Sequence, residues 1–179
     1  MQKEELREKV KDYLNECVGV TCEKASDESV KLLVDLFDGK IPELLLDMYK
    51  EYVLAEEIEC GEVVLYGIDR IVDENKDYIP GANIYPLGLF TFASEMDGDS
   101  ICFDSNDPAF PVYQCSHSLL DDEEEICFSK DGKIQSIPFS YENVIRISAR
   151  LSDSFDEFIE KLLDDDIELL SVTEMIKKF

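Results

Sequence analysis

Near the start of the chain, apolar residues recur at the spacing of helices. Leu6, Val10 and Leu14 lie four residues apart among charged residues, which predicts an amphipathic helix. Ser26 is a residue type that caps a helix N-terminus, and Pro42 suits the first turn of a helix. The expected helices cover residues 3–16, from 26 to near Gly39, and from 43 to about 53.

The middle of the chain changes to short apolar runs that turn signals separate. Asp97-Gly98 and Asp131-Gly132 are dipeptides typical of tight turns between antiparallel strands. A succession of short strands of this kind predicts an antiparallel meander. The expected strands cover residues 63–66, 87–93, 100–103, 112–115, 125–128 and 134–139.

The end of the chain returns to helical spacing. Ser154 with Glu157, and Ser171 with Glu174, each form the pattern of a capping box. They predict one helix that ends near residue 163 and a last short helix over residues 172–178. Helices, then strands, then helices indicate a single α+β domain over residues 1–179, with a mostly antiparallel sheet flanked by N- and C-terminal helices.

The strongly negative net charge of the chain disfavours some classes of binding partner. The chain has a formal net charge of -25, and residues 51–128 alone hold 19 acidic and 2 basic side chains. This balance disfavours a nucleic-acid binder and adhesion to anionic membranes, because both depend on lysine and arginine. A basic protein partner would explain the acidic excess, and so would solubility alone. The sequence leaves both explanations open.

The sequence offers neither a metal nor a cofactor site. The six cysteines form no CxxC pair, and starting an EF-hand calcium loop at Asp97 puts Ile101 and Pro108 at ligand positions. No glycine-rich phosphate loop is present. The N-terminus has no apolar signal segment and no apolar stretch is long enough to cross a membrane, so we expect a cytoplasmic protein.

One pair of residues admits an enzymatic alternative. His117 is the only histidine, and Cys115 lies two residues before it, so both would face the same side of a strand. A cysteine beside a histidine base is the arrangement of a nucleophilic hydrolase. A structural or interface role for His117 is the competing interpretation, and the one we favour.

Five motifs, in order, resemble the SUKH superfamily of the SMI-KNR type. Among them, Asp97 to Asp104 resembles the family's turn and strand, and Ser154-Phe155 resembles the start of its closing helix. The resemblance implies an α+β fold and a non-enzymatic binding function, because many bacterial members resemble immunity proteins that block a cognate toxin. The motifs cover residues 41–49, 86–94, 97–104, 111–117 and 149–163.

Charge and resemblance together suggest a non-enzymatic immunity protein that neutralises a basic toxin domain, for example a nuclease, through an acidic surface. A regulatory or scaffold protein with a partner other than a toxin is the alternative. We expect no cofactor, no metal and no nucleic acid as ligand. The expected partner-binding residues are Asp97, Asp99, Asp104, Asp107, Tyr113, His117, Asp121, Asp122, Glu123, Glu124 and Glu125.

Overall fold

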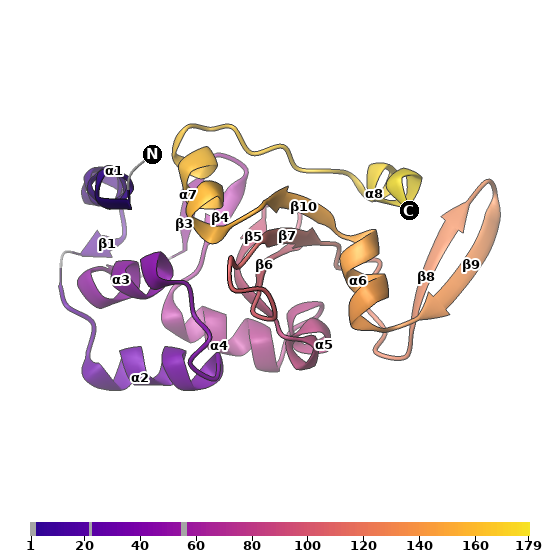
Figure 1. Ribbon diagram of the computed structural model, residues 1–179, viewed down its shortest axis with the longest axis horizontal. Coiled ribbons are helices and arrows are strands. Elements are labelled where there is room, and N and C mark those ends of the chain that lie inside the picture. Colours follow the sequence, from indigo (N-terminus) through magenta and orange to yellow (C-terminus); the bar gives the residue numbers. More distant parts are fainter. Residues whose placement is uncertain (1–2, 22, 55–56) are drawn as a thin grey trace.

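A computed structural model describes residues 3–21, 23–54 and 57–179 of the chain and has the expected α+β architecture (Figure 1). Its main sheet has six antiparallel strands in the order β10-β7-β6-β5-β4-β3. The strands from β3 to β7 follow one another as neighbours, which confirms the predicted meander for this part of the chain. They are β3 (Ile58–Cys60), β4 (Val63–Leu65), β5 (Leu89–Glu95), β6 (Ser100–Asp104), β7 (Val112–Cys115) and β10 (Ala149–Ser152).

The helices flank this sheet, and those predicted at both ends of the chain are present. The helical elements are α1 (Lys3–Glu16), α2 (Asp27–Leu36), α3 (Glu43–Glu51), α4 (Ile68–Lys76), α5 (Gly81–Ile84), the 3₁₀ turn η1 (Tyr85–Leu87), α6 (Tyr141–Ile147), α7 (Phe155–Leu163) and α8 (Val172–Lys178). Over the described residues, none of these helices combines the length and the apolar character needed to cross a membrane.

Two hydrophobic cores lie on the two faces of the sheet. Helices α1, α2, α3 and α7 pack with alternate strand residues such as Phe92 and Phe103 in the larger core. Residues of the opposite alternation, such as Cys102 and Cys115, face the smaller core with α5, α6 and α8. Both faces of β6 and β7 are therefore buried, and all their residues are inaccessible.

The last two predicted strands do not join the sheet. β8 (Glu125–Lys130) and β9 (Lys133–Pro138) form a hairpin of their own, so the expectation of one continuous meander is wrong here. The reason is that β10 takes the position beside β7, while the chain after β7 buries Leu119 and Leu120 in the smaller core. Figure 1 shows the hairpin at one extremity of the molecule, with β9 outermost.

Several elements were not anticipated from the sequence. Residues 149–152 form strand β10, although the whole segment from Ala149 to Leu163 was compared with a closing helix. Helix α3 ends at Glu51 because Val53 and Leu54 form strand β2, which pairs with β1 (Val20–Thr21). Helices α4 and α6 were also missed.

Candidate functional site

A carboxylate and the only histidine meet where β6 begins. The Oδ1 atom of Asp99 accepts hydrogen bonds from the backbone N–H of His117 at 3.0 Å and from its ring Nδ1–H at 2.8 Å. Asp99 is only 5% exposed, whereas half of the His117 side chain is exposed. Because Nδ1 is held by Asp99, Nε2 is the ring nitrogen that remains available to a partner. The structure thus brings together two residues that sequence analysis chose separately.

Gln114 extends this pair into a buried network. Its Nε2 group donates hydrogen bonds of 3.0 Å to Asp99 Oδ2, to Glu95 Oε2 and to the Leu170 carbonyl. Its Oε1 atom accepts one from the Leu170 N–H at 2.8 Å. Gln114 is fully buried on β7, so it ties the segment between α7 and α8 to the sheet. Sequence analysis did not single out Gln114 or Glu95.

Carboxylates from three distant segments gather at this end of the sheet. The β3–β4 turn lies beside the β5–β6 turn, where the Met96 N–H donates to the Glu62 carbonyl at 3.2 Å. The Asp165 carboxylate lies against Gly61, and Figure 1 shows the segment from α7 to α8 crossing this end of the sheet. We call the group the acidic rim, and its members are Glu62, Glu95, Asp97, Asp164, Asp165, Asp166 and Glu168.

Few cations neutralise the acidic rim. Among the described residues, the ion pair that reaches it joins Lys9 to Asp164. Six of its seven members are exposed, and Glu95 is partly buried. Burial raises the pKa of Glu95, and the carboxylates of Asp99 and Asp97 raise it further. The rim therefore has a strong negative potential that also acts on its own members.

This pKa shift predicts how the acidic rim affects stability. A carboxyl with a raised pKa in the folded state is penalised when it ionises, so its cost is absent below the ordinary pKa of 4.5 and grows as pH rises through the folded pKa. Glu95→Gln stays neutral and can still accept the Gln114 hydrogen bond. At neutral pH we expect the variant to melt about 2 °C above the wild type. Below the ordinary pKa of 4.5, the two proteins should melt at the same temperature.

Thermal unfolding followed by circular dichroism across this pH range measures the difference between the two proteins. Glu62→Gln, which neutralises an exposed carboxylate of the same rim, is the matched control. The effect of Glu62→Gln on the melting temperature should be small, and it should stay constant at all pH values above the ordinary carboxylate range. A Glu95→Gln effect that does not depend on pH would contradict the prediction.

Two of the expected partner-binding carboxylates lie at the opposite end of β6. Asp104 is buried and accepts hydrogen bonds from the Tyr141 hydroxyl at 2.5 Å and from the Asn106 N–H at 2.9 Å. Burial first, and then Asp104, raise the pKa of Tyr141. Asp107 accepts a hydrogen bond from the Ala109 N–H in the following turn. Asp104 thus orders a turn at which it is buried, away from the acidic rim.

Tyr113 also differs from its expected position. We expected Tyr113 among the partner-binding residues, but it is 6% exposed and packs in the smaller core. The guanidinium group of Arg150 lies 5.9 Å from the ring centroid. The pattern of alternation on β7 explains the difference, because α6 and α8 cover the face that Tyr113 occupies. We therefore leave Tyr113 and Asp104 out of the candidate surface.

The acidic run Asp121 to Glu125 is exposed and leads into the β8–β9 hairpin. Within it, Asp122 Oδ1 accepts hydrogen bonds from the backbone N–H groups of Glu124 at 2.7 Å and Glu125 at 3.3 Å. This local turn leaves the other carboxylates in solvent. The run starts only four residues after His117, so a partner that covers His117 can also reach it.

The cysteine of the enzymatic alternative does not face the histidine. The Cys115 Sγ atom lies 3.4 Å from Cys102 Sγ and 3.3 Å from Ser148 Oγ, and both cysteines are fully buried. Burial raises the pKa of Cys102, which disfavours a thiolate there. His117 Nδ1 is instead bound to Asp99. This geometry gives no support to a cysteine nucleophile activated by His117.

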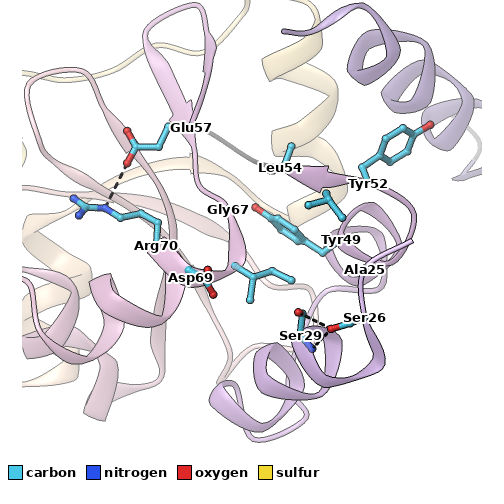
Figure 2. Close-up of a pocket in the computed structure, with 12 residues that line it drawn as sticks. Ala25, Ser26, Ser29, Tyr49, Tyr52, Leu54, Glu57, Gly67, Asp69 and Arg70 are labelled. Carbon is cyan, nitrogen blue, oxygen red and sulfur yellow. Dashed lines mark hydrogen bonds and ion pairs between the residues drawn. The ribbon is translucent and has the colours of Figure 1, made fainter. Parts of the chain in front are cut away.

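A separate pocket of about 400 Å³ lies between α2, α3 and α4 (Figure 2). Arg70 and Glu57 lie together at one side of the pocket (Figure 2), with 3.5 Å between Nε and Oε1, and Arg70 also pairs with Glu74 at 2.6 Å. The Tyr49 hydroxyl donates to the Tyr66 carbonyl. Arg70 and Tyr49 thus have partners within the protein, and none of the residues that line the pocket is a histidine.

Two further searches, one for a metal site among the described residues and one for similar proteins, found nothing. Within the described residues, no three His, Cys, Asp or Glu side chains come together in a way that could hold a metal ion. Comparisons with family models, with curated proteins and with solved structures found no match. The candidate surface consequently depends on its own geometry: His117 on Asp99, the acidic rim, and the run Asp121 to Glu125.

Proposed function

We propose that this chain is a non-enzymatic immunity protein that binds and neutralises a basic toxin domain. The observation that carries the proposal is the acidic rim, where three segments far apart in the sequence bring exposed carboxylates to one end of the sheet. Concentrated like charge lowers the stability of a compact protein. A partner with the opposite charge would relieve this repulsion when it binds to the acidic rim.

Electrostatics indicates the kind of partner. Complementary charge accelerates encounter and selects against partners with the wrong sign. A toxin that acts on nucleic acid carries basic residues where it binds phosphates. A protein that places carboxylates against these basic residues of the toxin would exclude the nucleic acid, because it occupies the groups that bind phosphate. The resemblance to the SUKH superfamily supports an immunity protein over other acidic binders.

The direct test is co-expression with the product of the adjacent reading frame, followed by affinity purification at low and at high salt. We expect capture of a basic domain, protection of the host cell from its toxicity, and a complex that weakens as salt screens the charges. The variant Asp165→Lys, Asp166→Lys, Glu168→Lys reverses the charge at three positions of the acidic rim. It should weaken the complex about 100-fold, in line with losses at central interface residues.

A matched control changes the net charge by the same amount at positions outside the acidic rim. Glu23→Lys, Glu28→Lys, Asp35→Lys alters three exposed residues in and before α2. It should leave affinity within about threefold, since only long-range steering is affected. Equal losses in both variants would indicate that total charge matters and the rim does not. A neutral partner held equally well at high salt would favour a regulatory scaffold and contradict the proposal.

A further inference from the structure

The β8–β9 hairpin has an open edge. The two strands form a sheet of their own, and within the described part of the chain no other strand lies beside β9. Figure 1 places β9 on the side of the hairpin that faces away from α8 and the rest of the molecule. An unpaired strand edge is a template for another strand, and proteins usually protect it.

The register identifies the backbone groups on this edge. Asp131 and Gly132 both have positive φ, and Lys130 pairs with Lys133, so the turn has two residues. In such a hairpin the closing pair exchanges two hydrogen bonds, and every second pair does the same. The N–H and C=O groups of Ile134 and Ser136 therefore point away from β8.

Protection is limited to the two ends of β9. The Pro138 carbonyl accepts a hydrogen bond from Asn143 Nδ2 at 2.9 Å, and proline has no N–H. Lys133 supplies a charge at the tip, which is a common way to discourage pairing. The stretch between them remains open, and the Ile134 side chain there is 85% exposed.

Charge indicates the chemistry of a strand that fits this edge. Glu125 lies on the same exposed face as Ile134 and Ser136, at the end of the hairpin near the body. The other carboxylates of the run Asp121 to Glu124 follow directly beyond it. A strand that pairs with β9 would meet an apolar residue at one end and carboxylates at the other. Lysine or arginine would complement the acidic end.

From this geometry we infer that β9 binds an extended segment of the partner by β-strand addition, with an apolar side chain beside Ile134 and basic side chains toward the run Asp121 to Glu125. The inference rests on the proposed function, because it takes the partner to be a basic protein. Main-chain hydrogen bonds to Ile134 and Ser136 would supply affinity, and the carboxylates would set direction and register. It places the partner's contact on a surface separate from the acidic rim.

Hydrogen exchange on the full chain tests this directly. The probe is a short peptide with valines at one end and lysines at the other, and the control peptide has glycine and proline in place of the valines. The first peptide should slow exchange of the Ile134 and Ser136 amides about tenfold or more, whereas the control peptide should not. Unchanged exchange at both amides with the lysine-valine peptide overturns the inference.

Two variants at one position separate backbone pairing from side-chain contact. Ser136→Pro removes the outward N–H, and Ser136→Ala removes the hydroxyl but keeps the N–H. Ser136→Pro should weaken peptide binding about tenfold relative to Ser136→Ala, which corresponds to the loss of one main-chain hydrogen bond. Equal affinities would overturn strand addition. Should Ser136→Pro not fold, the exchange data on the wild type still decide the question.

Further outcomes distinguish this inference from the proposed function. Glu123→Lys, Glu124→Lys should weaken the peptide about tenfold, and no effect would refute a basic strand as the occupant. Pairing of β9 with a second copy, seen as a dimer by light scattering without peptide, would also refute it. If the captured toxin depends on the acidic rim but not on Ser136, only the strand-addition inference fails. If no toxin is captured while the peptide protects Ile134, the proposed function fails.

Discussion

Replacing Phe103 by alanine is expected to lower the free energy of unfolding by about 3–5 kcal/mol, the typical cost of removing a buried aromatic ring. Phe103 lies on β6 and is 0% exposed. Its ring centroid lies between 5.2 and 6.3 Å from those of Phe37, Phe90, Phe92, Phe110 and Phe155. Such edge-to-face and tilted arrangements add to the burial of area. A marginally stable domain could lose much of its stability by this change.

Urea unfolding followed by tyrosine fluorescence or circular dichroism measures this loss. Phe103→Leu keeps most of the side chain and should cost about half as much, because a smaller cavity is left. Ile134→Ala, at a side chain that is 85% exposed, should change stability by less than about 0.5 kcal/mol. A loss below about 1 kcal/mol for Phe103→Ala would contradict the close packing of the aromatic cluster.

Gln114→Leu should be the second most damaging change, at about 2–4 kcal/mol, because it leaves several buried polar groups without partners. The amide of Gln114 satisfies Asp99, Glu95 and both backbone groups of Leu170. Leucine has a similar volume, so loss of packing contributes little. We also expect the segment that joins α7 and α8 to detach locally, since Gln114 holds it to β7.

Two measurements separate global from local effects in this variant. Urea unfolding gives the overall loss, and hydrogen exchange at the Leu170 amide reports on the segment itself. Gln135→Leu, at an exposed position of β9, is the matched control. It should change neither the free energy of unfolding nor the exchange rate of the Leu170 amide. If Gln114→Leu left Leu170 as protected as in the wild type, the network would not be what holds the acidic rim together.

The local elements with clear signals were predictable. Ser171 and Glu174 form a full capping box at α8, as the sequence indicated. At α7 the Ser154 side chain accepts from the Glu157 N–H, but the Glu157 carboxylate accepts from the Asp153 N–H instead of from Ser154. The turn at Asp131-Gly132 has the positive φ values that this dipeptide favours. Short-range geometry determines each of these features.

Helix α4 shows why other elements were missed. Asn75 is buried and bonds both backbone groups of Thr91 on β5, at 2.9 and 2.7 Å. Gly81 lies so close to Glu74 that a Cβ atom would come within 2.3 Å of its carbonyl oxygen. No helix was expected over these residues from the sequence. Their roles depend on β5, which lies far along the chain.

The sequence by itself determined the α+β class, most of the helices and strands of the main sheet, and the acidic character of the chain. Periodicity, caps and turn residues act over a few positions, and charge is a sum over the composition. Only the tertiary structure decided that Asp99 would hold His117, that Asp104 and Tyr113 would be buried, and that β8 and β9 would leave the sheet. Those outcomes depend on which strand takes the edge beside β7 and on where the chain returns after α7. Neither is encoded in neighbouring residues, because both follow from packing two cores against one sheet.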